Sequence, residues 1–363
     1  MRRLALGLAI LPLLAPLACD EAGSDGLDGG MDGDAGPPLV WQKVGDLPSN
    51  EDFMGIWGRS RRDPETMLEA ELEIFVVGFG GTILRYDGTT WSKETTTSTQ
   101  PLTAISGTGL PDPTNPRADP KLTFAVGWNG TILERSPAGT WAPLTNTPTS
   151  SEDLFDVTMA NNESGMIVGD NGRVLVFDDP GAGPVQWRIN RFAVRGEFSN
   201  MLIDPKASLK AVWTNGNTYY MVGAGGAAFR STNGPRNYEA LDTLISDPLV
   251  GVWGPGGDNV FAVGLDSLLL NFSGGQWRRV NLEGLPRVFL MDADGQGGDI
   301  TVVGWRGTVL RRGPDGYFAE RTDINTDLRG IWIDPITEVA WAVGASGTIL
   351  RRDPPPPPDA GIP

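Results

Sequence analysis

Histidine is absent from the 363 residues, and cysteine occurs once. Histidine is the commonest general base and the commonest side-chain ligand of transition metals, so its absence argues against the usual metal-dependent chemistry. It also excludes Ser-His-Asp and Cys-His catalysis. A single cysteine leaves no disulfide to form within the chain. We therefore expect no catalytic residue, no cofactor and no metal site.

Charged residues are scarce, at 20% of the chain, and acids outnumber bases by 45 to 29. The formal net charge of -16 is unsuited to binding a phosphate backbone, and no run of Lys and Arg with interleaved aromatic residues occurs. We expect no nucleic-acid partner. The 49 Gly and 29 Pro favour many short strands and turns over long surface helices.

An apolar stretch from Leu4 to Ala18 follows two arginines and is too short to span a bilayer comfortably as a helix. This layout is typical of a signal peptide over residues 1–18. The next residue is Cys19, and the segment resembles a bacterial lipoprotein signal, which implies a lipidated Cys19 at the mature N-terminus. Pro16 departs from that pattern, which usually has Leu there. The alternative is an ordinary signal peptide and a secreted protein.

Residues 19–38 are rich in Gly and Asp and contain few large apolar side chains, so they cannot build a core. We interpret them as a flexible tether between membrane and folded domain. A calcium site is the alternative, since Asp25, Asp28, Asp32 and Asp34 cluster there, but their spacing does not match an EF-hand loop. Residues 354–363 are expected to form a stiff Pro-rich tail.

A Val-Gly step recurs seven times between these segments. Its glycines are Gly78, Gly127, Gly169, Gly223, Gly264, Gly304 and Gly344. Each unit has two apolar runs, a Gly-x-x-Gly turn and a third run, although the fifth unit has Ser267 in place of the second Gly. A fourth segment follows in the first six units. A period near 40 residues with several strand patterns per unit indicates propeller blades. The first Gly of each turn is expected to end a strand, and the second to permit a positive φ.

The fourth segment of six units begins with an aromatic residue. These residues are Trp91, Trp141, Trp187, Tyr238, Trp277 and Phe318. The seventh unit has none, but Val40–Val44, with Trp41, has the same form and precedes the first complete unit. We therefore predict that this N-terminal segment pairs alongside Thr348–Arg352 and closes the ring.

The sequence thus predicts an all-β fold, a seven-bladed β-propeller of four-stranded antiparallel blades over residues 39–353. Ten of the twelve Trp are expected to pack between blades. An insertion at Arg59–Glu73 widens the first blade and suggests a short helix at Pro64–Glu73.

The repeated pattern VG-x-x-GTIL-R…DG-x-x-W resembles the photosystem II stability and assembly factor family over most of residues 40–352. That resemblance implies a seven-bladed propeller acting as a chaperone-like binding protein in membrane-complex assembly. The repeats also resemble the Asp-box of sialidases, although the segments Asp87–Trp91 and Asp315–Phe318 lack its Ser-x-Asp-x-Gly form. A sialidase would need an arginine triad and a Tyr/Glu nucleophile pair, and we find neither.

The two middle residues of each Gly-x-x-Gly turn are expected to point to solvent and to need no particular type for folding. Large aromatic residues at these positions are costly unless they pack or bind something. Phe79, Trp128 and Trp305 occupy them in blades one, two and six. With Asn129 and Arg306 they predict a recognition surface for protein or glycan. The alternative is that these rings fold over neighbouring turns and bind nothing.

These features favour a monomeric, non-enzymatic binding or assembly protein, lipid-anchored in a bacterial envelope, with a protein or glycan partner. One alternative is a glycan-active enzyme that uses paired carboxylates. The candidates for such a pair are Asp292, Asp294, Asp299, Asp323 and Asp327. A second alternative is a purely structural surface lipoprotein.

Overall fold

A computed structural model describes residues 41–63, 65–66, 69–110, 122–144, 151–162, 164–178, 187–189, 207–235 and 238–354. The predicted signal peptide, Cys19, the tether and the tail beyond residue 354 lie outside these residues. All described strands belong to one compact unit, Leu39–Pro363.

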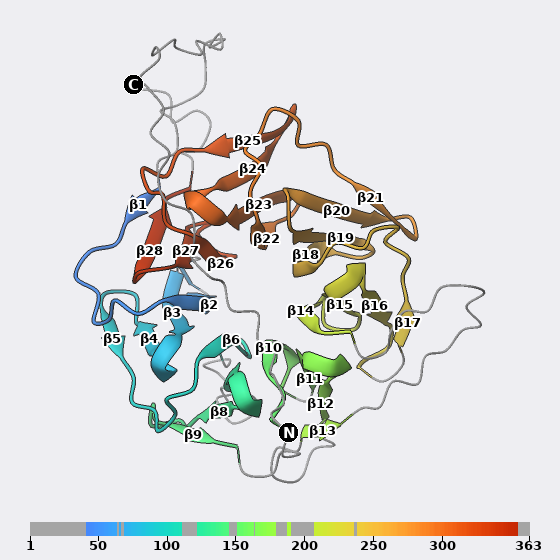
Figure 1. The fold of residues 1–363 in the computed structure, drawn as a ribbon. Coiled ribbons are helices and arrows are strands. Elements are labelled where there is room, and N and C mark those ends of the chain that lie inside the picture. The colour runs from blue at the N-terminus through green and yellow to red at the C-terminus, as the bar shows by residue number, and fades with distance from the viewer. Residues whose placement is uncertain are drawn as a thin grey trace, which may run out of the picture. The chain divides into compact units, whose positions relative to one another are not determined.

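Seven four-stranded antiparallel sheets surround a common axis, each forming one blade of a propeller (Figure 1). From the axis outward, blade 1 contains β2 (Phe53–Arg62), β3 (Glu69–Gly78), β4 (Ile83–Tyr86) and β5 (Trp91–Lys93). Blade 2 contains β6 (Leu102–Gly107), β7 (Thr123–Gly127), β8 (Ile132–Arg135) and β9 (Trp141–Pro143). Blade 3 contains β10 (Leu154–Asn161), β11 (Ser164–Gly169), β12 (Val174–Asp178) and β13 (Trp187–Ile189).

The remaining blades follow the same order. Blade 4 contains β14 (Leu209–Thr214), β15 (Tyr219–Gly223), β16 (Ala228–Ser231) and β17 (Tyr238–Ala240). Blade 5 contains β18 (Leu249–Gly256), β19 (Asn259–Gly264), β20 (Leu268–Ser273) and β21 (Gln276–Arg279). Blade 6 contains β22 (Leu290–Gln296), β23 (Asp299–Gly304), β24 (Val309–Gly313) and β25 (Gly316–Glu320). Blade 7 contains β26 (Leu328–Ile333), β27 (Ala340–Gly344), β28 (Thr348–Arg352) and β1 (Gln42–Lys43).

Blade 7 combines the two ends of the propeller, as the sequence predicts. β1 lies beside β28, with Gln42 paired to Arg351 and Lys43 to Leu350 (Figure 1). The Val44 N–H extends the pairing by donating to the Ile349 carbonyl oxygen at 2.9 Å. The predicted all-β fold, blade number and closure are all confirmed. Strand pairing between chain ends therefore completes the ring.

The recurring Val-Gly step has a steric cause. In every blade the first Gly of the turn lies against the residue that precedes the innermost strand. A Cβ on Gly78 would lie 2.2 Å from the Asp52 carbonyl oxygen, and one on Gly344 would lie 1.9 Å from that of Asp327. Because real Cβ atoms do not approach an oxygen so closely, only glycine fits at this position in the repeat.

The second half of each turn has left-handed backbone at two successive positions. Gly81 and its counterparts have positive φ, as predicted, and Ser267 takes this place in blade 5 with φ 53°. The residue before also has positive φ, 53° at Asn129 and 58° at Arg306. We expected that neither middle residue of the turn needs a particular residue type. This is wrong for the second middle residue, because left-handed backbone favours Gly, Asn and Asp.

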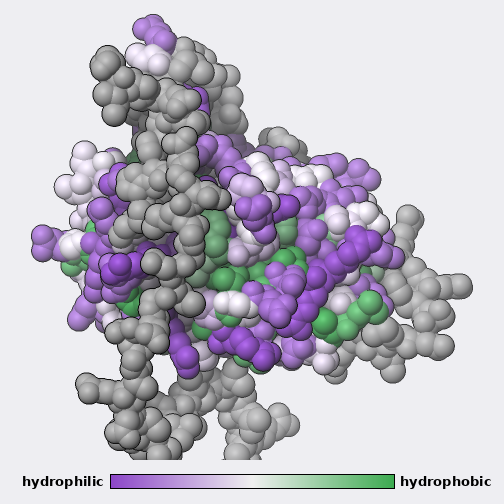
Figure 2. All heavy atoms as spheres, turned by 90° about the horizontal axis from the view of Figure 1, so that it is seen from above, coloured by the Kyte–Doolittle hydropathy of each residue, from purple (hydrophilic) through white to green (hydrophobic). Residues whose placement is uncertain are grey.

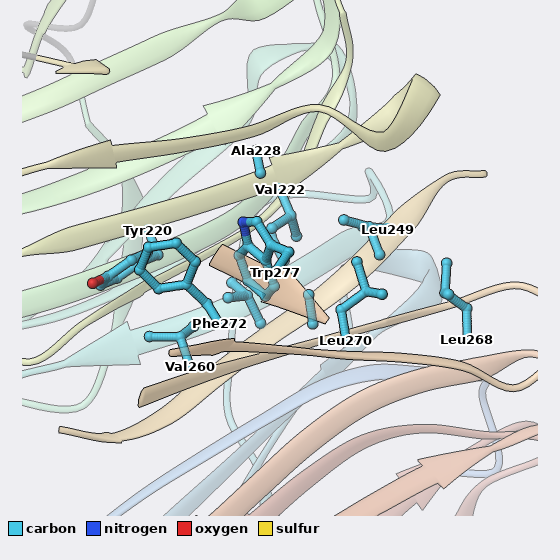
Figure 3. Packing of buried hydrophobic residues seen from close by; sticks show 12 residues of the cluster. Tyr220, Val222, Ala228, Leu249, Val260, Leu268, Leu270, Phe272 and Trp277 are labelled. Atoms are coloured by element: carbon cyan, nitrogen blue, oxygen red, sulfur yellow. The ribbon is translucent and has the colours of Figure 1, made fainter. Parts of the chain in front are cut away.

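Hydrophobic side chains fill the joints, a term used here for the contacts between neighbouring blades. Joint 4/5 shows the pattern: Tyr220 from β15 faces Phe272 and Trp277 from β20 and β21 (Figure 3). The ring centroids of Tyr220 and Phe272 are 5.8 Å apart. Burying side chains of this size stabilises the fold by about 1.5–3 kcal/mol each, so the joints are the core of the ring.

The tryptophans predicted to pack between blades do so wherever their side chains are described. They comprise six buried residues, Trp41, Trp141, Trp253, Trp277, Trp332 and Trp341, and three that are partly buried, Trp57, Trp91 and Trp213. The side chain of Trp187 lies outside the described part of the chain.

Two local predictions are wrong. In blade 6 the residue that pairs as Trp91 does in blade 1 is Tyr317, and it packs against the core cluster of joint 5/6. Phe318, the predicted aromatic, points to the other side of the strand and is 44% exposed. The helix suggested at Pro64–Glu73 is not formed in the described part of that segment, since Glu69–Glu73 belong to β3, where Glu71 and Glu73 pair with Arg61 and Arg59 of β2.

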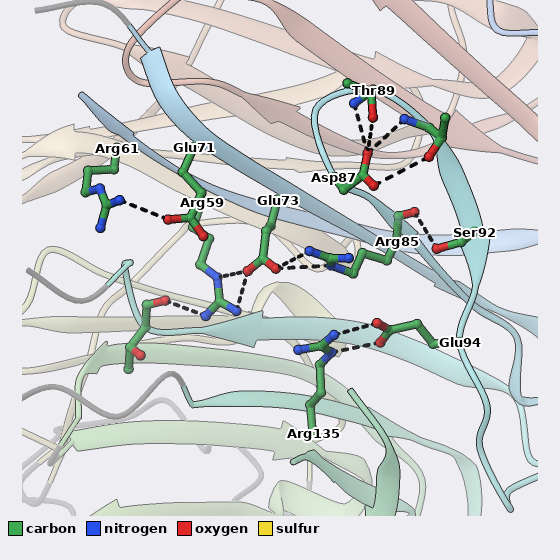
Figure 4. Close-up of polar contacts among 12 residues, drawn as sticks. Arg59, Arg61, Glu71, Glu73, Arg85, Asp87, Thr89, Ser92, Glu94 and Arg135 are labelled. Atoms are coloured by element: carbon green, nitrogen blue, oxygen red, sulfur yellow. Dashed lines mark hydrogen bonds and ion pairs between the residues drawn. The ribbon is translucent and has the colours of Figure 1, made fainter. Parts of the chain in front are cut away.

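Buried ion pairs reinforce joint 1/2 (Figure 4). Glu94, just after β5, accepts hydrogen bonds from Arg135 Nε at 2.8 Å and from the indole N–H of Trp141 at 2.7 Å. Within blade 1, Glu73 accepts from both Arg59 and Arg85. The hydrogen bond to Glu94 raises the pKa of Arg135 above its usual value. The joint therefore holds paired charges rather than isolated ones.

On the side of the ring that Figure 2 shows, the described surface is mainly hydrophilic, and the hydrophobic residues form small areas among polar ones. No helix in the described segments is long and apolar enough to cross a bilayer.

Candidate binding face

One face of the ring carries the six Gly-x-x-Gly turns and the blade 5 turn that ends in Ser267, and it is called the turn face here. Five of the turns contain a short 3-10 segment: η1 (Phe79–Gly81), η2 (Trp128–Gly130), η3 (Asp170–Gly172), η4 (Ala224–Gly226) and η5 (Trp305–Gly307). The candidate residues Phe79, Trp128, Asn129, Trp305 and Arg306 all lie in η1, η2 and η5. The sequence therefore places them on a common face.

Backbone hydrogen bonds hold the three aromatic residues in place. The N–H groups of Phe79, Trp128 and Trp305 donate at 2.9–3.0 Å to the carbonyl oxygens of Asp52, Pro101 and Phe289. Each acceptor directly precedes the innermost strand of the same blade. The rings thus extend from a rigid backbone, which reduces the conformational entropy that binding a partner would cost.

Phe79 and Trp128 form a pair across joint 1/2. Their ring centroids are 5.9 Å apart and their planes meet at 70°, an edge-to-face arrangement. Phe79 is partly buried, whereas Trp128 remains 39% exposed. Edge-to-face pairs contribute about 0.5–1.5 kcal/mol beyond burial, so the contact orients the indole without covering it.

Trp305 lies apart from this pair, beyond the turn of blade 7. Its ring packs at 5.4 Å from that of Phe289 in its own blade, and it is partly buried. Arg306 is exposed, and its guanidinium has no hydrogen bond or ion pair within the described residues. The predicted surface therefore consists of two separate groups, an aromatic pair on blades 1 and 2 and a Trp-Arg step on blade 6.

Carboxylates from the next blade cap several of these turns. The N–H of Asn129 donates to Asp153 at 2.9 Å, and that of Arg306 donates to Asp327 at 3.0 Å. Asp52 accepts from the Ser346 N–H at 2.8 Å. Burial opposes ionisation of Asp52, but this hydrogen bond and the Arg329 guanidinium outweigh it and hold the pKa of the carboxyl below its usual value. These acids have a structural role.

Three other acids occupy the innermost strands. Asp292 accepts hydrogen bonds from its neighbour Ala293 and from Ile331 of blade 7, and Asp294 accepts from Ile333 of blade 7 in the same way. Asp156 of blade 3 accepts from Val212 of blade 4. Burial raises the pKa of each carboxyl to about 7, although the backbone N–H groups act in the opposite direction.

The carboxylates that the sequence suggested for an enzyme do not gather in one place. Asp299 opens β23 and is exposed, with Arg311 3.7 Å away. Asp323 pairs with Arg321, and Asp327 caps the turn of blade 6. Within the described segments, no group of three or more acids, histidines or cysteines is arranged to hold a metal ion.

The sequence reasoning missed two exposed leucines of the turn face. Leu244 is 80% exposed and Leu265 is 44% exposed. Leu265 belongs to the turn of blade 5, the one copy that has Ser267 in place of the second Gly. That departure from the repeat is the sequence signal that marks this region.

No protein-family model matches the chain, and no curated protein is similar to it in sequence. Solved structures are nevertheless similar in fold. YCF48 bound to D1 peptide has a TM-score of 0.64 at 15% identity, over 88% of this chain and 99% of that one. YCF48 from Cyanidioschyzon merolae has a TM-score of 0.62 at 15% identity, over 86% and 99%. The likeness to YCF48 agrees with the seven-bladed fold that the resemblance of the repeats implies.

An enzyme shares the fold as well. A catalytically inactive variant of virginiamycin B lyase from Staphylococcus aureus, crystallised with quinupristin, has a TM-score of 0.66 at 11% identity, over 87% of this chain and 99% of that one. At such identities the similarity shows a common propeller fold and no more.

Proposed function

We propose that the protein is a non-enzymatic binding propeller whose turn face captures another polypeptide at the Phe79–Trp128 pair. The observation that carries the proposal is an indole 39% exposed on a backbone fixed by hydrogen bonds. Tryptophan is among the residues most enriched at the energetic centres of interfaces, because it combines a large apolar area with few rotatable bonds.

The fold relatives favour a peptide over a glycan as the partner. YCF48 is a propeller of the same blade number, and one of its structures contains a D1 peptide. We take this as an analogy at the level of the fold, and the Phe79–Trp128 pair as the physical reason to apply it here. An assembly role in the envelope is the corresponding biological proposal.

A lyase function has less support from this sequence. The virginiamycin B lyase in the comparison is described as inactive when one histidine is replaced by alanine, and this chain contains no histidine. The three buried carboxylates of the innermost strands accept backbone N–H groups from neighbouring blades. We interpret them as structural ties between blades.

The test compares two exposed aromatic residues. Trp128→Ala removes the proposed anchor, and Phe318→Ala removes a ring of similar exposure, 44%, from the outer strand β25. Each variant and the wild type serve as bait for detergent-solubilised envelope proteins and for an immobilised glycan panel. We expect a set of proteins that the wild type and Phe318→Ala retain and Trp128→Ala loses. Identical retention by all three baits would refute the proposed site, and retention on glycans alone would refute the polypeptide partner.

The membrane anchor is a further part of the proposal. We infer that Cys19 carries a lipid and that the propeller is held at an envelope membrane through the Gly/Asp-rich segment that follows. Metabolic labelling with a fatty-acid analogue should mark the wild type and leave Cys19→Ser unlabelled. Labelling of both proteins, or of neither, would contradict lipidation at this residue.

A further inference from the structure

The seven repeats serve as an internal alignment, and blade 5 departs from it at one turn. Six turns have Gly at the last position of Gly-x-x-Gly, whereas blade 5 has Ser267. At this position a Cβ on Gly81 would lie 2.0 Å from the Ser98 carbonyl oxygen, and one on Gly226 would lie 2.2 Å from that of Ile245. A serine fits only if the segment leading to the next blade follows a different path.

In blade 5 that segment, residues 280–289, is fastened to the turn by specific hydrogen bonds. Ser267 Oγ donates to the Pro286 carbonyl oxygen at 2.8 Å and accepts from the Val288 N–H at 3.0 Å. Arg287 Nε donates to Asp266 Oδ1 at 3.0 Å, and the second guanidinium nitrogen reaches Oδ2. The segment is therefore held in an arched path by its last residues.

The arch leaves a cavity of about 510 Å³ on the turn face. Its apolar lining comes from Val280, Leu282 and Leu285, which pack against the core of joint 5/6 and remain partly exposed. Arg279 and Glu283 line it too and are exposed, and neither side chain has an ion pair within the described residues. Cavities of 300–1,000 Å³ are typical of ligand sites.

Two exposed leucines lie on the same face as this cavity. Leu265 directly precedes Asp266 of the cavity wall and is 44% exposed. Leu244, in the segment between blades 4 and 5, is 80% exposed and has φ 57°. Asp323, at the matching position before blade 7, has φ 41°, so the left-handed turn belongs to the repeat. What distinguishes Leu244 is its exposed apolar side chain.

We propose that the blade 5 cavity binds a large aliphatic side chain of an extended peptide that carries one acidic and one basic residue beside that side chain. This proposal rests on the proposed polypeptide-binding function and assigns a second anchor to the same face. The apolar lining accommodates the aliphatic group. Arg279 and Glu283 are opposite in sign and form no ion pair with any residue that the structure describes, so their complement is a segment with both signs rather than an anion or a cation alone.

The experiment uses the full chain in detergent and immobilised synthetic nonapeptides. The test set has a central Leu with Glu and Lys on either side, in both orders, and the comparison sets have a central Ser or two flanking residues of equal sign. The variants are Leu285→Gln, which makes the lining polar, and Arg279→Glu, which reverses one unpaired charge. The matched control is Arg278→Glu, an exposed neighbour on β21 that does not line the cavity.

We expect the wild type and Arg278→Glu to retain the central-Leu, mixed-charge peptides at least tenfold more strongly than the comparison sets. Arg279→Glu, a surface change that does not threaten folding, should lose this preference. Equal retention of all peptide sets, or equal losses for Arg278→Glu and Arg279→Glu, overturns the proposal. So does self-association that Arg279→Glu abolishes, because a second copy would then be the occupant.

The outcome is separable from that of the proposed function. If Trp128→Ala abolishes partner capture while Arg279→Glu leaves both capture and peptide preference unchanged, only the second anchor is refuted. If neither variant changes capture, the binding role of the turn face is refuted with it.

Discussion

Joints 4/5 and 6/7 each bury an equivalent tryptophan between two blades, but the side chains around that tryptophan differ. At joint 4/5 the interior is apolar, and the buried indole N–H of Trp277 has no hydrogen-bond partner within the described residues. At joint 6/7 the equivalent indole, Trp41, donates to Glu320 at 2.7 Å, and Arg352 donates to the same carboxylate at 2.9 Å. The two joints differ at two repeat positions: blade 6 has Glu320 where blade 4 has Leu241, and blade 7 has Arg352 where blade 5 has Phe272.

The difference teaches how the ring is closed. Blades 4 and 5 are consecutive along the chain, so apolar packing suffices to bring them together. Trp41 belongs to the N-terminal segment, which pairs with the last strand of the chain. Only two residues of β1 are paired there, so backbone pairing alone fixes the register weakly. A directional contact with a buried carboxylate fixes that register, as buried polar groups do in other systems. Joint 1/2, between two consecutive blades, has the same Glu-Arg-Trp set, so the set is not confined to the closing joint, and joint 1/2 provides a matched control.

The largest effect is expected from Trp41→Ala. Removing a buried indole should lower the free energy of unfolding by about 3–5 kcal/mol, and it should also release β1 from blade 7. Trp277→Ala should cost a similar amount but leave β1 in place. Thermal unfolding measures the first effect, and limited proteolysis near residues 42–45 measures the second. Equal protease resistance of the two variants would contradict the closing role of Trp41.

A smaller loss is expected from Glu320→Ala. It leaves the side chain of Arg352, 4% exposed, without its buried counter-ion, which should lower the free energy of unfolding by about 3 kcal/mol. Glu94→Ala is the control, because Arg135 is 12% exposed and also interacts with Glu73. Denaturant unfolding should show the larger loss for Glu320→Ala. A larger loss for Glu94→Ala would disprove the claim that joint 6/7 depends more strongly on its buried carboxylate than joint 1/2 does.

Replacing each indole by phenyl isolates the hydrogen bond. Trp41→Phe loses the bond to Glu320, whereas Trp277→Phe removes an N–H that has no partner in the described part of the chain. We expect the first change to cost about 1.5–3 kcal/mol more than the second, the range for a hydrogen bond to a charged group. Denaturant unfolding of the two variants checks this difference, and equal losses would mean that Glu320 contributes nothing through Trp41.

Joints 3/4 and 6/7 should also make stability depend on pH, through Asp156, Asp292 and Asp294. Their pKa values of about 7 lie above the value near 3.9 of an unfolded aspartate. The folded state therefore binds more protons than the unfolded state between these values, and stability falls as the pH rises from about 4 to 7. With no histidine in the chain, no other side chain with an ordinary pKa titrates between pH 5.5 and 8.

Thermal unfolding should accordingly give a melting temperature several degrees higher at pH 5.5 than at pH 8. Asp292→Asn should reduce that difference by at least a third, since one of three groups is removed and the Asp292 charge also helps to raise the pKa of Asp156 and Asp294. An exposed acid such as Asp315, changed to Asn, should leave the pH dependence as it is. A melting temperature that rises between pH 5.5 and 8 would contradict the burial argument.

The parts of the fold that the sequence reveals are those with a local steric cause. Gly344 recurs because no Cβ fits 1.9 Å from a carbonyl oxygen, and Trp41 is recognisable because the same segment heads other blades. The choice between Tyr317 and Phe318 was missed because adjacent aromatic residues face opposite sides of a strand, and one step in register exchanges them. The left-handed backbone at Arg306 could not be predicted from the residue type, because arginine rarely adopts that conformation.

The candidate face was predictable in location but not in arrangement. Aromatic residues in turns identify Phe79 and Trp128, yet their mutual contact depends on the distance across joint 1/2, which the sequence does not encode locally. The blade 5 cavity depends on Ser267 meeting Val288 some twenty residues later, and the inner carboxylates depend on backbone groups of another blade. Such features arise from tertiary contacts and become visible only in the assembled ring.

Cross-linking tests the closure of the ring most directly. In a Cys19→Ser background, Gln42→Cys and Arg351→Cys place two thiols at exposed, paired positions of β1 and β28. A short bifunctional maleimide should join them within one chain, and peptide mass spectrometry identifies the product. The control pair, Gln42→Cys with Arg279→Cys on blade 5, should remain unlinked. Linkage of the control pair, or failure to link residues 42 and 351 in folded protein, would contradict a propeller closed by its own N-terminal strand.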